Sequence, residues 1–364
     1  MDSVASQHAA GDGRAIEFTG HWREFLPIAV TNVLLMIVTL GIYRFWATAR
    51  TRRYLWSRTH VIDDSLEWSG TGKEMFLGFL IVIAVLLPFF LFIQFLFPAL
   101  IARGQEAAAF AAIGVFYIAI LYLTGVAVFR ALRYRLSRTW WHGIRGGSDE
   151  PGWNYGGEYF GVYLLCAFTL FIPFPWATVK LWNARWNQMS FGPSQFQAQL
   201  TTDGLKGRWA LVYVVPIVLL LVMGILMMGI LGSAARGGTP EANVGIFGAV
   251  FLVFLLVYLA IPLMTLHWFA KYYRHAADAT KLGDLEFGFD ASTWDWLKLF
   301  LGNIALAIVT LGFGLAFWGY RNWAFMVRHT HLYGSVDLAG LTQSTVVAPR
   351  EAEGWADAFD VGAI

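Results

Sequence analysis

The stretch NVLLMIVTLGIYRFWATARTRRYLWSRTH, residues 32–60, decides most of what the sequence says about the fold. An apolar run ends at Thr39-Leu40-Gly41, and a tail rich in Arg and aromatic residues follows. The pattern returns 271 residues later without a gap, so that Asn32 matches Asn303 and Gly41 matches Gly312. Agreement at polar and glycine positions exceeds what apolar composition alone would produce. The sequence therefore predicts an internal duplication.

Further copies of the basic tail stand at other offsets. At an offset of 80, Arg50 and its neighbours match Arg130 and the residues after it. Weaker matches, at offsets of 130 and 221, reach Lys180 and Lys271. In the copy at offset 130, Phe171 replaces the glycine, so we do not expect that copy to share the backbone role of Gly41.

Composition indicates a membrane protein. The chain is 57% apolar and only 14% charged, against roughly 25% charged residues in a typical soluble domain. Seven apolar segments are near the 20 residues that a helix needs to cross a hydrocarbon layer about 30 Å thick. They lie near 25–46, 75–101, 107–132, 159–182, 209–235, 244–270 and 296–319. We expect one integral membrane domain over 17–340, a flexible polar tail at 1–16 and a flexible acidic tail at 341–364.

The segments differ in their connections. The second and third are joined by a short turn, as are the fifth and sixth, whereas the first, fourth and seventh stand alone and are interrupted by Gly or Pro. Gly-bounded aromatic and polar stretches between segments predict small β-hairpins outside the membrane. The predicted fold is an all-α polytopic membrane protein of pseudo-repeated helical units, with broken or re-entrant lone segments and small β-hairpins at the cytoplasmic face.

The positive-inside rule favours re-entrant lone segments. If all seven segments cross, the 26 Lys and Arg divide as 15 against 11. If the lone segments turn back, only Arg103 and Arg236 lie outside, and the division becomes 24 against 2. The second arrangement requires that the non-helical backbone at the breaks be shielded by protein or water.

Two sets of residues are candidates for function. Polar and glycine positions inside the first and last lone segments either pack helices or line a path for a solute; they are Asn32, Thr39, Gly41, Asn303, Thr310 and Gly312. Arginines in the basic tails either anchor topology or bind lipid headgroups and other anions at the interface; they are Arg50, Arg53, Arg130, Arg133 and Arg321.

Other chemistry has little support in the sequence. His329 and His331 form an H-x-H pair, but a zinc site needs three or four ligands, and Cys166 is the single cysteine. Neither a G-x-S-x-G elbow nor a phosphate-binding P-loop motif is present. With a net charge of only +2, nucleic acid is not an expected partner. We expect no cofactor, no metal and no enzyme activity.

The pattern N-x6-TLG-x-Y-x-F-W followed by R-x-R-R-Y resembles the YjgN family of bacterial inner-membrane proteins. The resemblance runs from about Phe18 to Gly340 and is most specific over 32–60. It implies a multi-pass protein of the bacterial cytoplasmic membrane, and it brings no agreed activity.

Two classes of function fit these observations. A transporter or channel-like protein for a small anionic, zwitterionic or lipid-derived solute is favoured by repeats with broken helices. A lipid-contacting scaffold, or a protein that organises partners, is favoured by the basic aromatic tails. Membrane lipids are the expected partners in both cases, and the oligomeric state is left open.

Overall fold

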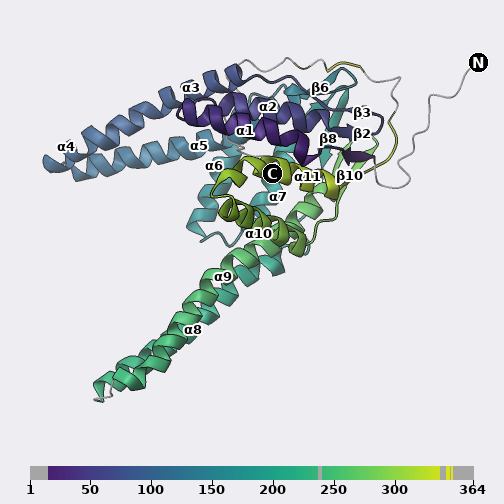
Figure 1. Ribbon diagram of the computed structural model, residues 1–364. Helices are drawn as coiled ribbons and strands as arrows, with labels where there is room; N and C mark the ends of the chain where they lie inside the picture. Colours follow the sequence, from purple (N-terminus) through teal and green to yellow (C-terminus); the bar gives the residue numbers. More distant parts are fainter. Residues whose placement is uncertain (1–14, 237–239, 337–341, 345, 347–364) are drawn as a thin grey trace, which may run out of the picture.

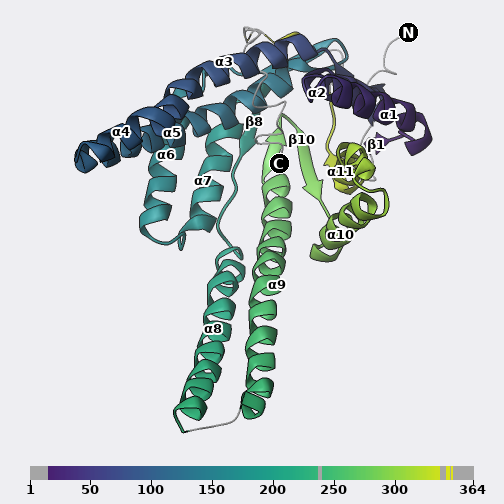
Figure 2. The same ribbon diagram turned by 60° about the vertical axis from the view of Figure 1, so that its left-hand side comes forward.

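The fold combines three short helical hairpins, two long helical hairpins and a layer of short strands (Figure 1). A computed structural model describes residues 15–236, 240–336, 342–344 and 346. The long hairpins leave a central hub in different directions, and the strands lie together on one side of that hub (Figures 1 and 2).

Each lone segment is a pair of helices joined by a tight turn. The pairs are α1 (Trp22–Val38) with α2 (Arg44–Ser57), α6 (Trp153–Phe168) with α7 (Phe174–Trp186), and α10 (Thr293–Val309) with α11 (Trp318–His329), the last joined through the 3-10 helix η2 (Phe313–Phe317). A strand follows each pair directly or within four residues. Both ends of each lone segment therefore return to the strand layer.

A threonine and a positive φ angle make each turn. The Thr39 hydroxyl donates to the carbonyl of Leu35 at 2.7 Å and accepts from the backbone N–H of Tyr43 at 2.9 Å. Leu40 and Gly41 then take φ angles of 51° and 87°. Thr310, Leu311 and Gly312 repeat this arrangement. The threonine hydroxyl thus adds one hydrogen bond on each side of the break, and these two bonds hold the turn.

The middle hairpin makes the same turn without glycine. Thr169 donates to the carbonyl of Leu165 at 2.7 Å, and Leu170 and Phe171 have φ angles of 52° and 59°. The expectation that this copy would not share the backbone role of Gly41 is therefore wrong. Phe171 adopts a left-handed conformation that costs a non-glycine residue of the order of 1 kcal/mol or more.

Gly41→Val should destabilise the protein by about 1–2 kcal/mol, because a β-branched residue is strained at a φ of 87°. An added Cβ would meet no atom within 4 Å, so the loss reports backbone strain and not a clash. Reversible unfolding in mixed detergent micelles measures it. Gly41→Asn is the matched control, since Asn tolerates this conformation. Equal stability of the two variants would contradict the prediction.

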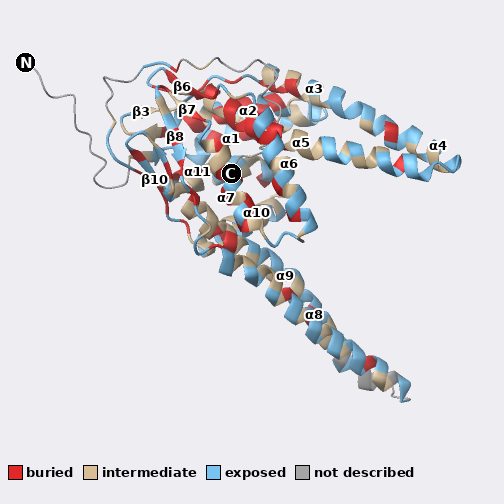
Figure 3. Cartoon of the chain, turned by 180° about the vertical axis from the view of Figure 1, so that it is seen from behind, coloured by how far each residue is buried: buried red, intermediate tan, exposed pale blue. Residues whose placement is uncertain are grey.

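The two long hairpins carry the helices that are long and apolar enough to cross a membrane. The first joins α3 (Gly72–Leu91), a π-helix η1 (Phe92–Leu96) and α4 (Phe97–Ala102) to α5 (Glu106–Arg138); the second joins α8 (Lys206–Ala235) to α9 (Pro240–Asp278). The four candidate spans are Gly72–Ala102, Glu106–Arg138, Lys206–Ser233 and Phe247–Asp278. Outside the hub their surfaces are mostly exposed (Figure 3), as expected of helices that face lipid.

The expectation of an all-α polytopic fold holds only in part: the chain is mainly helical, with four candidate membrane spans, but the small β-hairpins join into one large sheet. Eight strands pair in chain order, each antiparallel to the next. They are β4 (Glu67–Trp68), β5 (Thr139–Trp141), β6 (Ile144–Gly147), β7 (Ser190–Phe191), β8 (Ser194–Ala198), β9 (Thr280–Leu282), β10 (Leu285–Phe289) and β11 (Thr330–Tyr333). Isolated hairpins are marginally stable and their edges seek partners, so pairing between hairpins is the stable outcome.

A three-stranded sheet of β1 (Ile16–Phe18), β2 (Thr59–Val61) and β3 (Asp64–Ser65) extends the strand layer, and β1 lies close to β11. The two ends of the fold therefore meet. The Tyr320 hydroxyl donates to the carbonyl of Gly20 at 2.9 Å, and the Trp323 indole donates to the Thr59 hydroxyl at 2.8 Å. The hub is consequently a nearly closed ring of helical hairpins beneath the strands.

Most residues of the two predicted tails, 1–16 and 341–364, lie outside the described residues. Within the second, Gln343 donates from Nε2 to the carbonyl of Gly143 at 2.9 Å, and Arg145 donates from Nη2 to the carbonyl of Val346 at 2.7 Å. The described part of that segment therefore lies against the β5–β6 hairpin.

Candidate functional site

The two matched asparagines tie together the helices of their own hairpins. Asn32 is buried, and its Nδ2 donates to the carbonyl of Ala47 at 3.4 Å and to the Thr51 hydroxyl at 3.3 Å. Asn303 is also buried; it donates to Oδ1 of Asn322 at 2.9 Å and accepts from Nε of Arg321 at 2.7 Å. Both amides thus connect the two helices of a lone segment.

The six candidate path residues do not lie together in one site. Asn32, Thr39 and Gly41 belong to the first hairpin, and Asn303, Thr310 and Gly312 to the last. Among them, Thr310 lines the groove described below. A path-lining role for this set stays a prediction.

The five candidate arginines occupy different environments. Arg50 and Arg53 are exposed on α2. Arg130 donates from Nε to the carbonyl of Pro151 at 2.9 Å and lies over a Trp ring on α6. Arg133 is buried, with 8% of its surface exposed, so it lies inside the hub and not at an outer surface. Arg321 is half-buried between α10 and α11.

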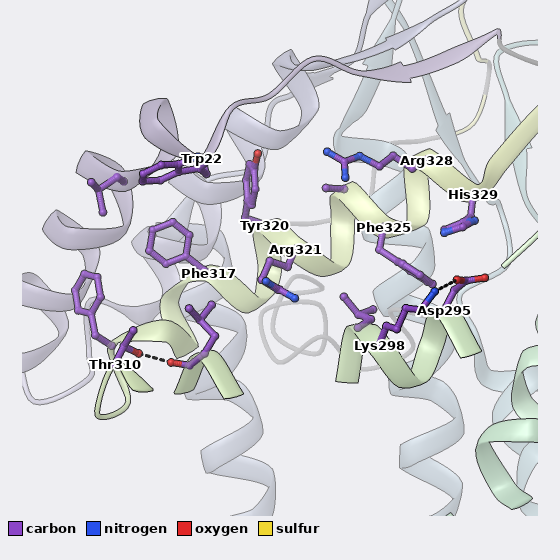
Figure 4. Close-up of a pocket in the computed structure, with 15 residues that line it drawn as sticks. Trp22, Asp295, Lys298, Thr310, Phe317, Tyr320, Arg321, Phe325, Arg328 and His329 are labelled. Carbon is purple, nitrogen blue, oxygen red and sulfur yellow. Dashed lines mark hydrogen bonds and ion pairs between the residues drawn. The ribbon is translucent and has the colours of Figure 1, made fainter. Parts of the chain in front are cut away.

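A groove of about 800 Å³ lies where the first and last hairpins meet (Figure 4). Its walls come from the start of α1, from α10 and from the segment that runs through η2 into α11. The lining residues are Trp22, Leu26, Asp295, Lys298, Leu299, Leu306, Thr310, Phe313, Phe317, Tyr320, Arg321, Ala324, Phe325, Arg328 and His329. Most of this surface is apolar, so the groove suits a ligand with a hydrocarbon part.

The cations of the groove extend from its middle, at Arg321, to the end nearest the strands (Figure 4). Arg321, Arg328 and Lys298 are its cations, and Asp295 is the one carboxylate of the lining. Neither arginine forms an ion pair with any residue in the described part of the chain. In Figure 4 the Arg321 side chain extends between Tyr320 and the α10 wall. Arg328 is exposed, whereas Arg321 already donates from Nε to Asn303, so the groove offers an anion the head of Arg328 and the remaining N–H groups of Arg321.

The acidic group of the groove is already engaged. Asp295 accepts from the backbone and hydroxyl of Ser292 in a capping box at the start of α10, and Lys298 donates to it at 3.4 Å. Those hydrogen bonds from Ser292 hold the pKa of Asp295 below its usual range. Asp295 therefore stays ionised at neutral pH and does not act as an acid in the groove.

His329 belongs to a small polar cluster beside the groove. Asp290 accepts hydrogen bonds from Nδ1 of His329 and from Nε2 of His331, the latter at 3.0 Å. Burial alone would raise the pKa of Asp290, but the hydrogen bonds from the two histidines outweigh it and lower that pKa. Among the described residues, His, Cys, Asp and Glu form no group of three that could hold a metal ion.

The groove grades from polar to apolar along the hairpin. Arg328 and Lys298 lie at the end nearest the strands, whereas Leu306 and Phe313 lie near the turn. The turn itself is strongly exposed and apolar, with Leu311 96% exposed. Leu40 and Leu170 occupy the same place in the other two hairpins, at 93% and 73% exposure. Such tips are suited to a hydrocarbon environment.

Sequence reasoning found Thr310 and Arg321 but missed most of the groove. Trp22 and Leu26 come from the other end of the chain, and Arg328 lies in a tail that also carries buried residues. The basic and aromatic residues near Trp22 could have suggested a binding surface. The sequence around them does not show that this surface faces residues 295–329.

Comparisons with known proteins identify the family. A family model described as a bacterial protein of unknown function, DUF898, matches residues 14–358. The inner membrane protein YjgN of Salmonella typhimurium is 22% identical over an alignment that covers 89% of this chain and 90% of that protein. Inner membrane protein YjgN of Escherichia coli O157:H7 is 28% identical over 35% of this chain and 29% of that protein. No solved structure matches the chain. The resemblance seen in the sequence is confirmed, and the chain belongs to the DUF898 family of bacterial proteins.

Proposed function

We propose that this protein is a multi-pass inner-membrane protein that binds an anionic lipid in the groove between α1 and α10–α11 and acts as a lipid-contacting scaffold. The observation that carries the proposal is the gradient of the groove, from Arg321 and Arg328 to an apolar end beside an exposed apolar turn. A phospholipid has the same gradient, with a charged headgroup and hydrocarbon tails.

In this proposal the two long hairpins cross the bilayer and the three lone hairpins re-enter it from the cytoplasmic side. The division of Lys and Arg, 24 against 2, supports this orientation. The exposed leucines of the three turns support insertion of the tips, since each would otherwise hold an apolar side chain in water. The strand layer then lies on the cytoplasmic face, close to the lipid headgroups.

Replacing both groove arginines, Arg321→Gln with Arg328→Gln, should weaken binding of an anionic lipid. Each basic residue near a membrane surface contributes about 1 kcal/mol to attraction of anionic lipid, so the pair corresponds to a loss of roughly thirtyfold in affinity. The measurement is titration of fluorescent phosphatidylglycerol into the purified protein in neutral detergent, with phosphatidylcholine as the uncharged comparison.

Arg50→Gln with Arg53→Gln is the matched control for that titration. Both residues are exposed on α2 and lie outside the groove, and Arg50 matches Arg321 at the offset of 271. The control should bind phosphatidylglycerol within about twofold of the unchanged protein. If the two double variants lose affinity equally, the groove is not the site and the attraction belongs to the basic surface as a whole.

Movement of a small anionic, zwitterionic or lipid-derived solute is a second candidate function. One observation favours it: Thr310 and Arg321, expected from the sequence near a solute path, both line the groove. Flux of labelled lipid in proteoliposomes, compared with the Arg321→Gln and Arg328→Gln double variant, tests it. Binding without flux would leave the scaffold function alone. We propose no catalytic activity, because the sequence carries neither a G-x-S-x-G elbow nor a P-loop motif.

A further inference from the structure

The helix that begins the first long hairpin is irregular around Gln94. Residues Phe92–Leu96 form a π-helix, in which the backbone N–H of Phe97 bonds to the carbonyl of Phe92. Pro98 follows, and a proline has no N–H to donate to the carbonyl four residues earlier, here that of Gln94. The proline therefore accounts for the widened turn, and π-helical turns are frequent at functional sites.

Gln94 lies far from the polar ends of its helix. Arg103 is nine positions further along the helix, and a rise of 1.5 Å per residue makes that about 13 Å. With the turn after Arg103 at the far surface, Gln94 is near the middle of a hydrocarbon layer about 30 Å thick. No Asp, Glu, Lys or Arg occurs between Glu74 and Arg103. The Gln94 amide is therefore a polar group isolated in an apolar span.

The Gln94 side chain points away from α5, the other helix of its hairpin. Phe92 is buried and packs on Phe116 of α5, with ring centroids 5.2 Å apart. Two positions further on, a helical residue faces roughly the opposite side. Gln94 is accordingly exposed, as are Phe90 and Leu91 one turn before it. This surface of η1 and the end of α3 is called the Gln94 face below.

No element in the described part of the chain covers the Gln94 face. The Gln94 amide makes no hydrogen bond with the described residues. The other long hairpin, α8–α9, leaves the hub in another direction and does not approach η1 in either view (Figures 1 and 2). An amide that faces hydrocarbon without a partner is costly, so a partner from outside the chain is expected.

We propose that a second copy of this chain covers the Gln94 face, so that the two Gln94 amides hydrogen-bond to each other within the membrane. A primary amide is self-complementary, because it carries both an N–H donor and a carbonyl acceptor. Two copies related by a two-fold axis can exchange two such bonds while Phe90 and Leu91 pack around them. Interhelical amide contacts of this kind drive association of membrane helices.

Gln94→Leu should weaken dimerisation roughly tenfold, because it keeps the apolar packing and removes the amide pair. Single-molecule photobleaching of the labelled full chain in lipid bilayers, over a range of protein densities, measures the dimer fraction. Gln94→Asn keeps the amide and should restore most of the association. Gln105→Leu is the matched control: Gln105 directly precedes α5 at the polar end of the hairpin, so this variant should dimerise as the unchanged protein does.

Cross-linking keeps the proposal testable if Gln94→Leu folds poorly. In a Cys166→Ala background, Gln94→Cys should form a disulfide-linked dimer of this chain in oxidised native membranes. Leu96→Cys, which is also exposed but lies two positions further on and so on roughly the opposite side of the helix, should cross-link much less. An unchanged chain that is monomeric at all densities, a dimer that Gln94→Leu leaves intact, or cross-linking of Gln94→Cys to another protein would each overturn it.

Discussion

Cysteines placed at Arg103 and Arg236 should react with a membrane-impermeant maleimide added outside spheroplasts, and cysteines at Glu67 and Asp284 should not. Arg103 follows α4, and Arg236 follows α8, so both lie at the tips of the long hairpins, far from the strands. Glu67 is on β4, and Asp284 is in the β9–β10 turn. In the proposed arrangement both hairpins cross one bilayer, which then lies between these two pairs of sites.

The expected contrast is all or none, because each site is on one side of the membrane or the other. All four residues are exposed, so a failure to react reports the membrane and not burial. The experiment uses the Cys166→Ala background, and permeabilised cells supply the control in which all four cysteines react. Labelling of only one hairpin tip from outside would contradict the one-sided arrangement and favour seven full crossings.

The turns of the lone segments were predictable because their determinants are local. Thr39 bonds to backbone groups four residues away on either side, and the glycine two positions later accepts the positive φ. The short motif thus contains the whole turn. The prediction for Phe171 failed for a related reason: the hairpin held by Thr169 places Phe171 at a φ angle of 59°, although it is not a glycine.

The extent of the sheet could not be read from the sequence. A strand such as Asp64–Ser65 is too short to show alternation. Pairings between hairpins also join distant residues: Phe196 on β8 pairs with Leu282 on β9, across a long helical hairpin. Strand propensity indicates where a β-hairpin can form. Which neighbouring strand its edge pairs with depends on how the helical hairpins pack.

Local sequence also predicts some residues of the candidate groove, whereas others join it only through contacts between distant parts of the chain. Thr310 and Arg321 stood out because they match residues of the first lone segment, whereas Trp22 joins the groove only because the first and last hairpins meet. That meeting depends on a contact between residues more than 260 positions apart, Trp323 with Thr59. The position of the groove is therefore a consequence of ring closure.

Trp323 makes two of the contacts that close the ring. Its indole stacks on Trp56, with ring centroids 4.1 Å apart and planes 20° apart, and its Nε1 donates to the fully buried hydroxyl of Thr59 at 2.8 Å. Thr59 in turn donates to the carbonyl of Leu55, at the end of α2. The contact joins α11 to α2 and brings the walls of the groove together.

Trp323→Ala should therefore destabilise the protein by about 3 kcal/mol, the usual loss when a large aromatic side chain is removed from a packed core. Unfolding in mixed micelles with increasing SDS measures the loss. Trp323→Phe keeps an aromatic ring and removes the N–H donor, so about 1 kcal/mol is expected from the Thr59 bond and the smaller ring. Trp294→Ala is the matched control, since Trp294 is 59% exposed and should change stability by no more than about 0.5 kcal/mol.

Trp323 helps to close the ring but does not line the groove. Trp323→Ala should therefore also reduce phosphatidylglycerol binding. A variant that lost stability yet bound phosphatidylglycerol normally would show that the groove forms without ring closure.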